Sequence, residues 1–490
     1  MADVIIIGSG FGGSIAAKRF TEAGHHVQLL ELGEDWRSPA KLQQSQDTKF
    51  ILRLFRDYPV DYLQAKPKVV VTQGMGLGGG SLVYSGIHLR APASAFTGWP
   101  GGFTRARLDH YYARVEQRLA IAPLPGAASY RRSQVFAEAA SLRGLPAPVA
   151  NPLAMTGCTG CGWCVPICKW GKKNTMAHTY LADALATGRL TIRTNVKAQR
   201  VARSAGKYHV YYWGTGHKVD NYHTVNSGTL YGPLVADWVV IAGGAIESPT
   251  LLKRSAAGLA GFDTSNVGNG VDGTGDFVQG GLVNRDVQAY KGAIMMNHID
   301  RGDYVLEDIH AIPVGPTVKL EAAFADLQIH GKDRTWGLAY KQRFRDFGKR
   351  LFGIGIMGKQ GSGTVGNITV TDEAGNARLS NTAYQPPPGS LEDARAMITA
   401  LGGTPVRTLW ERSGVAATVH PVGGCRMGDV SSFAVQATNL EVRGNPGLYV
   451  IDGSVLPGSP FRNPSHTIAA VAERAMDVIL GVHAPTTWPT

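Results

Sequence analysis

Four short apolar runs along the chain predict β-strands that are buried on both faces. These runs are Val4–Ile7, Val27–Leu30, which is interrupted by Gln28, Trp238–Ile241 and Leu448–Ile451. Strands of a parallel sheet covered on both sides read as such continuous runs. Between the first two runs, apolar residues recur at helical spacing until Gly24, which predicts a helix that joins two parallel strands. The pattern therefore predicts an α/β fold.

A glycine motif of the form G-x-G-x-x-G joins the first strand to this helix. Gly8 permits the tight turn, Gly10 lets the backbone approach a pyrophosphate, and Gly13 lets the helix pack closely on the strand. The second strand ends at Glu31, whose carboxylate can accept both hydroxyls of an adenosine ribose. Strand, helix and acid at these distances predict a dinucleotide site. The acid disfavours a 2′-phosphate, so FAD or NAD is expected rather than NADP.

Two further glycine-rich turns are expected near the same cofactor. The segment GMGLGGGSLVYSG, residues 74–86, is flanked by apolar residues, which indicates an ordered loop facing a flat or anionic ligand. Its predicted contact residues are Gly78, Gly79, Gly80 and Ser81. In ADWVVIAGGAIESPTLL, residues 236–252, a turn through Gly243 follows the strand, and Ser248-Pro249 is predicted to open a helix.

The C-terminal part of the chain carries two more motifs. HPVGGC begins at His420, where a proline and two glycines put the histidine on a turn. Asp452 and Gly453 follow the fourth apolar run as a predicted turn, and helical periodicity predicts a last helix over 467–480. A cofactor domain built from all these blocks must be discontinuous.

The glycine-rich segments and the C-terminal motifs, in this order along the chain, resemble the glucose–methanol–choline (GMC) flavoprotein oxidoreductases. The resemblance is greatest to their cholesterol-oxidase-like branch. The resemblance rests on GMGLGGGSLV, HPVGGC and DGSVLPGSPFRNPSHTIAAVAER. It implies a bound FAD whose isoalloxazine ring lies over the GGGS loop and accepts a hydride at N5 from an alcohol. It also implies that Asp452 and Gly453 lie at the ribityl–phosphate region and that Val196 lies at the adenine. The last helix would point its N-terminus at the flavin edge where negative charge develops.

The same resemblance implies the catalytic residues. His420 matches the histidine that hydrogen-bonds the substrate hydroxyl as base or acceptor, and Asn463 matches the asparagine across from it at the flavin edge. His466 is the second choice, because many family members have a histidine near this point. The alternative for His466 is a helix-cap neighbour that faces the core.

The expected activity is FAD-dependent oxidation of a hydrophobic, steroid-like alcohol to a carbonyl. The acceptor is O2 or an electron-acceptor protein or quinone, so oxidase and dehydrogenase both stay open. One alternative is a sugar or polyol dehydrogenase that passes electrons through an iron–sulfur cluster. Others are a lyase or photodecarboxylase on the same fold, and a flavin-binding electron-transfer subunit.

Four of the five cysteines lie close together in the sequence, at Cys158, Cys161, Cys164 and Cys168. Their spacing matches a ferredoxin run, except that a lysine replaces the proline after the last cysteine. The sequence therefore predicts these four as metal ligands, with an iron–sulfur cluster as the first interpretation. Zinc, and thiols or disulfides that only brace a border loop, are the alternatives.

Composition limits the classes of function. The chain has 490 residues and a net charge of +12 from scattered basic residues, so no nucleic-acid surface is expected. No apolar run reaches 18 residues, and the first strand leaves no room for a leader, so a cytoplasmic protein is expected. KFILRLFRDYPVDYL, residues 49–63, mixes aromatic, apolar and basic residues as a lid or a peripheral membrane contact does, with ordinary packing as the alternative.

Three regions are expected from the distribution of motifs. The Rossmann-type FAD-binding domain is predicted to comprise 1–105, 176–275 and 411–490. Residues 106–175 form a connecting, cysteine-rich segment, and 276–410 form an α+β substrate domain with an antiparallel sheet. Within the latter, NITVTDEAGNARLS predicts a hairpin, and 391–401 reads as a helix.

Overall fold

The computed structural model describes most of the chain. It covers residues 2–45, 54–58, 69–214, 229–259, 261–309, 337–339, 342, 349–361, 366–370, 377–381, 384–408, 411, 414 and 416–482. The predicted lid or membrane contact at 49–63 falls largely outside the described residues. Among those described, no helix combines the length and the hydropathy needed to cross a bilayer.

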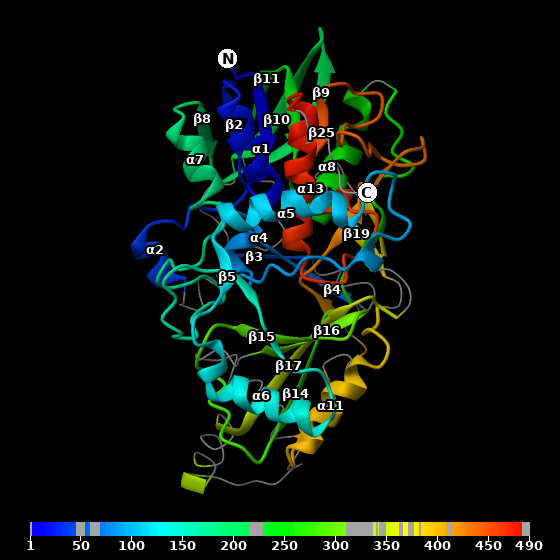
Figure 1. The fold of residues 1–490 in the computed structure, drawn as a ribbon. Coiled ribbons are helices and arrows are strands. Elements are labelled where there is room, and N and C mark those ends of the chain that lie inside the picture. Colours follow the sequence, from blue (N-terminus) through cyan, green and yellow to red (C-terminus); the bar gives the residue numbers. More distant parts are fainter. Residues whose placement is uncertain are drawn as a thin grey trace.

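A five-stranded parallel sheet forms the centre of the upper lobe in Figure 1. Its strands, in spatial order, are β25 (Leu448–Val450), β12 (Trp238–Ile241), β1 (Val4–Ile7), β2 (Val27–Leu30) and β8 (Leu190–Arg193). In the register of the sheet, Val4 pairs with Trp238 on one side and with Val27 on the other. All four apolar runs are therefore confirmed as strands, and the fold is mixed α/β.

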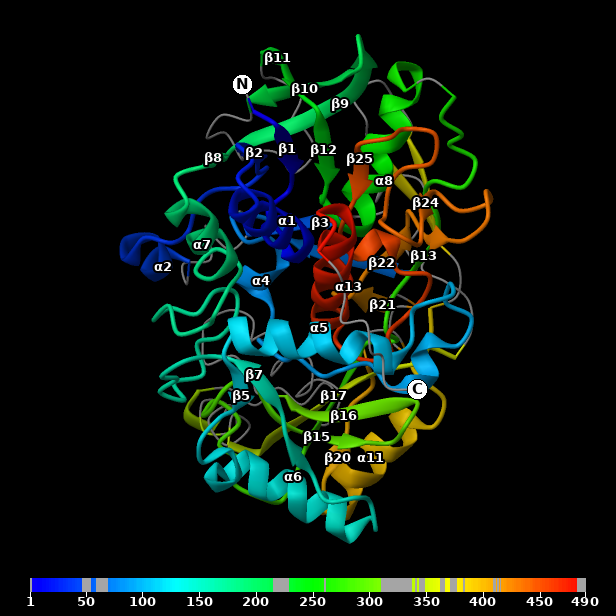
Figure 2. The same cartoon turned by 45° about the horizontal axis from the view of Figure 1, so that its top comes forward.

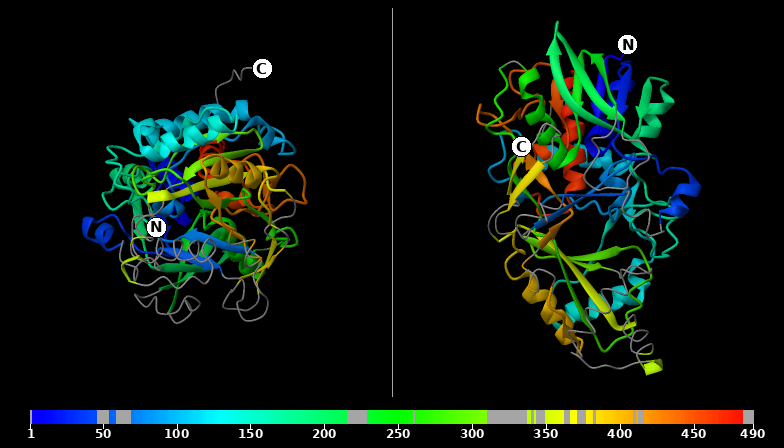
Figure 3. Two further views of the ribbon diagram at one scale, coloured as in Figure 1. Left: turned by 90° about the horizontal axis from the view of Figure 1, so that it is seen from below. Right: turned by 180° about the vertical axis from the view of Figure 1, so that it is seen from behind.

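Helices cover the face of this sheet that is turned to the viewer in Figure 1, and an antiparallel sheet lies behind it, as the right-hand view of Figure 3 shows. The helices are α1 (Phe11–Glu22), α5 (Arg105–Arg118), α7 (Tyr180–Ala186) and α13 (Pro464–Ile479). The sheet behind is β9 (Val196–Ser204), β10 (Lys207–Gly214) and β11 (Leu230–Ala236). Close helix packing depends on glycine, since a Cβ on Gly12 would lie 1.7 Å from the carbonyl oxygen of Ile451.

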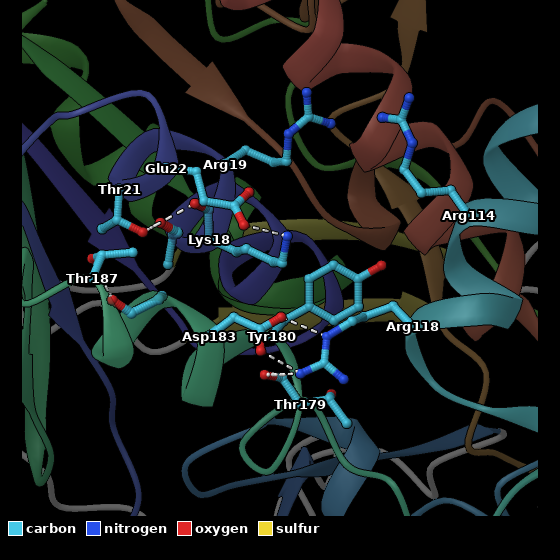
Figure 4. Close-up of polar contacts among 12 residues, drawn as sticks. Lys18, Arg19, Thr21, Glu22, Arg114, Arg118, Thr179, Tyr180, Asp183 and Thr187 are labelled. Carbon is cyan, nitrogen blue, oxygen red and sulfur yellow. Dashed lines mark hydrogen bonds and ion pairs between the residues drawn. The ribbon is translucent and has the colours of Figure 1, made fainter.

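Ion pairs hold the helices of the upper lobe together, and Figure 4 shows the arginine side chains that take part in them. Arg19 of α1 lies 2.7 Å from Glu473 and 2.6 Å from Asp477, both on α13. Arg114 of α5 reaches the same two carboxylates at 3.1 and 3.0 Å. The neighbouring Arg118 ties α5 to α7, as the dashed lines in Figure 4 show. The helices therefore meet through buried charges as well as through apolar side chains.

The lower lobe in Figures 1 and 2 is built on an antiparallel sheet of six strands. Its order is β20 (Thr404–Pro405), β14 (Phe277–Leu282), β17 (Leu351–Gly358), β16 (Tyr304–Ile309), β15 (Met295–Asp300) and β6 (Val149–Ala150). Helices α6 (Arg131–Leu142) and α11 (Ser390–Ala400) cover the face away from the upper lobe. The predicted connecting segment thus supplies α6 and β6 to this layer, and α11 matches the helix predicted over 391–401.

Smaller elements join the two lobes. One sheet has the order β19 (Ala377–Asn381), β18 (Gly366–Val370), β13 (Asn269–Asp272) and β22 (Val422–Gly424). A second sheet has the order β21 (Ala416–Thr418), β4 (Val69–Gly74) and β3 (Phe55–Tyr58). The remaining helices and strands are α2 (Pro39–Gln44), α4 (Gly80–Val83), β5 (Ile121–Pro123), β7 (Pro152–Ala154), α8 (Gly244–Ser255), β23 (Met427–Gly428) and β24 (Val435–Gln436). Strands β18 and β19 pair as the predicted hairpin.

Helix α8 begins earlier than predicted. It starts at Gly244, so Ser248 and Pro249 lie inside it rather than at its start. The hydroxyl of Ser248 donates to Asp452 at 2.5 Å, which ties the helix to the C-terminal turn. Gly424 packs beside the proline, because a Cβ there would lie 3.0 Å from the Cγ of Pro249. The proline that was expected to mark the helix start therefore lies inside the helix, packed against Gly424.

Candidate functional site

A cavity of about 540 Å³ lies between the two lobes. It collects predicted site residues from segments far apart in the sequence, namely Gly8, Gly10, Glu31, Gly79, Gly80, Val196, Gly243, His420, Asp452, Gly453 and Asn463. Gly13, Gly78, Ser81 and His466 lie behind this wall and not on it. The four predicted metal ligands are also outside the lining, although Val165 from the same segment is part of it.

The N-terminal glycine motif shapes one end of the cavity. A Cβ on Gly8 would lie 2.2 Å from the carbonyl oxygen of Ala242, and one on Gly13 would lie 2.1 Å from that of Gly8. A Cβ on Gly10 would meet no atom within 4 Å, although Gly10 lines the cavity. Gly10 therefore leaves room for a ligand at the N-terminus of α1, where free N–H groups favour a phosphate. The residues present fit a pyrophosphate-containing cofactor such as FAD.

The GGGS loop lies directly against this motif. A Cβ on Gly79, which has a φ of +53°, would lie 2.7 Å from the Cα of Gly10. Gly80 resembles Gly10 in facing open space on the cavity wall. The hydroxyl of Ser81 is buried and donates to the carbonyl oxygen of Gly78 at 2.6 Å. Gly78 and Ser81 thus hold the shape of the loop, while Gly79 and Gly80 face the cavity.

Glu31 is buried where the two glycine loops meet. Its Oε2 accepts hydrogen bonds from the N–H and the hydroxyl of Ser9, and its Oε1 accepts from the N–H groups of Gly33 and Gly76. Burial raises the pKa of Glu31, and these four donors oppose the rise. The main-chain N–H of Val196 donates to the carbonyl oxygen of Glu31 at 3.0 Å, so both residues lie on one stretch of wall.

Asp452 fixes the third glycine turn. Its Oδ2 accepts from the N–H of Gly244 at 2.7 Å and from Ser248 at 2.5 Å, and its Oδ1 accepts from the N–H of Ser454 at 2.8 Å. Burial raises the pKa of Asp452, and the bonds from Ser248 and Ser454 oppose that rise. The carboxylate therefore locks the start of α8 to the turn that follows β25.

His420 and Asn463 both line the cavity. The Nδ1 atom of His420 lies 2.9 Å from the hydroxyl of Thr274, and its Nε2 has no partner among the described residues. Burial lowers the pKa of His420, with Asp276 opposing, so the ring is neutral and can accept a proton. Asn463 precedes α13, and its buried Oδ1 has no hydrogen-bond partner within the described ranges. The cavity thus offers a base and an unpaired amide.

His466 lies in the core instead. Its Nδ1 is 2.8 Å from the carbonyl oxygen of His88, and its Nε2 is 3.3 Å from that of Tyr112. The ring also packs edge-on against the rings of both residues. Burial lowers the pKa of His466 to about 4. The geometry favours the alternative given for this residue, a side chain that faces the core.

The clustered cysteines do not converge on one point. Cys161 is exposed and Cys164 is buried in an apolar cluster, whereas Cys158 and Cys168 are intermediate. All four are free thiols, and no group of three or more His, Cys, Asp or Glu residues in the described part of the chain could hold a metal ion. Burial raises the pKa of Cys164 to about 12, which disfavours the thiolate that metals bind. The predicted iron–sulfur or zinc site is therefore not supported.

Several residues at the cavity carried no sequence signal. Thr274 and Asp276 lie behind His420, and Met295 and Met357 line the cavity from β15 and β17. They belong to a region without a recognisable motif. A single acid or methionine outside a motif carries no functional signal in the sequence. These residues are recognised only by their positions in the folded structure.

Comparison with known proteins identifies the family. Residues 2–271 and 364–472 match the N-terminal and C-terminal models of GMC oxidoreductases. An uncharacterized GMC-type oxidoreductase of Mycobacterium tuberculosis is 28% identical over 98% of this chain and 77% of its own length. A cholesterol oxidase of the same organism is 24% identical over 96% of this chain and 90% of its own length. A long-chain-alcohol oxidase of Arabidopsis thaliana is 22% identical over 96% of this chain and 67% of its own length. The crystal structure of pyridoxine 4-oxidase from Mesorbium loti has a similar fold, with a TM-score of 0.71 at 18% identity over 99% of this chain and 100% of that one. The chain therefore belongs to the GMC oxidoreductase family.

Proposed function

We propose that this protein is an FAD-dependent oxidoreductase that converts a hydrophobic alcohol into a carbonyl compound. The observation that carries the proposal is that His420 and Asn463 line the same cavity as three glycine-rich turns. Family membership supports the cofactor, since GMC oxidoreductases bind FAD. When bound, FAD supplies the acceptor for the hydride that leaves the alcohol carbon.

The chain's own residues divide the work of binding FAD. The open backbone at Gly10 and Gly80 would receive the pyrophosphate, beside the N-terminus of α1. Glu31 and Val196 would hold the adenosine end. The N-terminus of α13, which starts on the cavity wall after Asn463, would stabilise negative charge at the other end.

His420 acts as the base in this proposal. Its neutral ring can take the hydroxyl proton of the alcohol at Nε2, the ring nitrogen that has no partner within the described part of the chain. The side-chain amide of Asn463, which lines the same cavity, would donate from Nδ2 to the alcohol oxygen and hold it in place. His466 has no part in this step, because both of its ring nitrogens face main-chain carbonyls in the core.

The wall of the cavity supports a hydrophobic substrate. It includes the apolar side chains of Ile87, Val165, Ile294, Met295 and Met357. A polyol would leave hydroxyl groups unpaired against such a wall, which costs roughly 1–3 kcal/mol for each group. The names of two relatives, a cholesterol oxidase and a long-chain-alcohol oxidase, agree with a sterol or a long-chain alcohol.

The test is anaerobic mixing of the flavin-loaded protein with sterols, long-chain alcohols and polyols, while the visible absorbance of the flavin is recorded. A hydrophobic alcohol should bleach the flavin, and His420→Gln should abolish the bleaching without changing the circular dichroism spectrum. Adding O2 or a quinone to the reduced protein then identifies the electron acceptor. The proposal fails if no alcohol bleaches the flavin, and light-driven decarboxylation or cyanohydrin cleavage would point to the lyase class.

A further inference from the structure

Hydroxyl groups converge on the carboxylate of Asp276, directly behind the ring of His420. Tyr384 and Thr418 donate to its Oδ1 at 2.5 and 2.7 Å, and the hydroxyl of Thr274 lies 3.5 Å from the same oxygen. The N–H of Val419 donates to Oδ2 at 2.8 Å. The carboxylate of Asp276 therefore accepts hydrogen bonds from groups on several segments.

The directions of these hydrogen bonds are set by the main chain. The N–H of Asp276 donates to the Tyr384 oxygen at 3.1 Å, and the N–H of His420 donates to the Thr418 oxygen at 3.1 Å. Each hydroxyl carries one hydrogen, so both of these hydrogens are free to point at Asp276. Gly273 permits the crowding, because a Cβ there would lie 2.6 Å from the Tyr384 oxygen.

Thr274 completes the pattern. Its hydroxyl oxygen lies 2.9 Å from Nδ1 of His420 and 3.5 Å from Oδ1 of Asp276. If the hydroxyl donates to the carboxylate, it must accept from Nδ1, and the ring proton then lies on Nδ1. The lone pair of the neutral ring is left on Nε2, where no described residue competes for it.

We propose that Asp276, acting through Thr274, selects the His420 tautomer that leaves Nε2 free, and stabilises the imidazolium formed when Nε2 accepts the proton of the alcohol. This inference rests on the proposed function. In that step the O–H bond of the alcohol breaks, its proton goes to Nε2, and the hydride leaves the alcohol carbon for the flavin. Asp276 and Thr274 are positioning residues, and they touch neither substrate nor cofactor in this arrangement.

The charges around the ring agree with this role. The carboxylate of Asp276 lies 3.8 Å from Nδ1, and it raises the pKa of His420 against the lowering effect of burial. The carboxylates of Asp272 and Asp452 have other partners, namely Gln360 for the former and serine hydroxyls for the latter. Tyr384 is the other titratable group of the cluster, and its hydroxyl is bound to Asp276.

Four variants test the proposal. Thr274→Val removes the linking hydroxyl and Thr274→Ser retains it, while Asp276→Asn removes the charge. Asp263→Asn, at an exposed loop carboxylate, is the charge-matched control.

Flavin reduction by the alcohol should fall roughly 10–100-fold in Thr274→Val and Asp276→Asn, within the contribution of a positioned base. Thr274→Ser and Asp263→Asn should keep the native rate. The acid limb of the pH profile should move to lower pH in Asp276→Asn, because the imidazolium loses its counter-charge.

A second readout does not depend on activity. Ring-¹⁵N-labelled histidine in the flavin-free protein reports the tautomer of His420, whose signal is identified by its loss in His420→Gln. The native protein and Thr274→Ser should show the proton on Nδ1, and Thr274→Val should show it on Nε2 or on both nitrogens. The Thr274 pair keeps the test decisive even if Asp276→Asn does not fold.

Failure of this inference is distinct from failure of the proposed function. If His420→Gln loses flavin bleaching but Thr274→Val keeps the native rate and tautomer, Asp276 has no positioning role and the inference is overturned. If His420→Gln retains bleaching, the assignment of the base itself is wrong.

Discussion

The ammonium nitrogen of Lys173 lies 2.6 Å from the carbonyl oxygen of Tyr84. It also donates to the carbonyl oxygens of Leu82 and Cys164, at 2.7 and 3.0 Å. Tyr84 and Val165 line the cavity, so this buried cation joins the end of the GGGS loop to the cysteine segment. The cysteine segment therefore forms part of the cavity wall, and the hydrogen bonds of Lys173 hold it there.

Lys173→Met should loosen that wall. Three buried carbonyl groups would lose their donor, and each unsatisfied group costs about 1–3 kcal/mol. We expect a lower thermal unfolding temperature and earlier release of FAD, followed by flavin fluorescence during heating. Lys172→Met changes an exposed neighbour and is the matched control. Equal behaviour of the two variants would contradict the bracing role.

Gly10→Ala and Gly12→Ala should separate cofactor binding from folding. Gly10 has a φ of −65°, which suits alanine, and its Cβ would enter open space, so the flavin-free protein should fold normally but lose FAD. A Cβ on Gly12 would collide with the carbonyl oxygen of Ile451, so Gly12→Ala should be unstable even without FAD. The ratio of flavin to protein absorbance and a thermal scan of the flavin-free protein distinguish the two. A Gly10→Ala variant with full flavin content would place the pyrophosphate elsewhere.

The cysteines should act as structural thiols. Iron and sulfide analysis of the purified protein should find neither at stoichiometric level. Cys161→Ser should leave stability and electron transfer to one-electron acceptors unchanged, because Cys161 is exposed. Cys164→Ser puts a hydroxyl into an apolar cluster and should destabilise the protein by about 1–3 kcal/mol. Stoichiometric iron that disappears in Cys161→Ser would restore the iron–sulfur interpretation.

Acid should weaken the contact between α1, α5 and α13. Burial alone would raise the pKa of Asp477, but bonds from Arg114 and Arg19 hold it below its usual value. A carboxylate with a depressed folded pKa stabilises the protein above its unfolded pKa of about 3.9, and that stability is lost as the pH falls through the folded pKa. Asp477→Asn should therefore cost about 2–4 kcal/mol at neutral pH and flatten the acid limb of the stability curve. Asp183→Asn, which breaks the more exposed pair with Arg118, should cost less.

Met357→Ala should change substrate preference. It enlarges the apolar part of the cavity, and a lost methylene contact changes discrimination by roughly 1–3 kcal/mol. The ranking of alcohols by kcat/KM should shift toward bulkier ones. Met397→Ala removes a methionine that is also buried but belongs to α11, away from the cavity, and should lower stability without changing that ranking. A similar shift in both variants would mean that the effect is general loosening.

The sequence predicted the parts of the fold that depend on local pattern. The bounds of β1 and β12 agree with their apolar runs because strands covered on both faces have few polar positions, and β2 agrees although it contains Gln28. The start of α8 was misplaced, because a Ser-Pro pair is typical of a helix start and here it lies inside the helix. Cysteine spacing likewise describes the chain locally, but whether thiols meet depends on the path of the loop.

The part of the site that escaped sequence reasoning is the part assembled from distant segments. Asp276 and His420 are separated by 144 positions and meet only because β13 pairs with β22 and β21 pairs with β4. Neither Thr274 nor Asp276 belongs to a motif, so no spacing rule could join them to the histidine. His420 itself was predicted because the HPVGGC segment resembles a motif of the GMC oxidoreductases.

The order of strands in the central sheet has a consequence for synthesis of the chain. β1 leaves the ribosome long before its neighbour β12, which arrives more than 200 residues later, and β25 follows only at Leu448. Until then the edge of the nascent sheet and the packing surface of Gly12 remain without partners. Such long-range pairing slows folding and leaves apolar strands open to aggregation. This protein is therefore expected to depend on chaperones during production, and shortening it before Leu448 should yield insoluble material rather than a smaller folded domain.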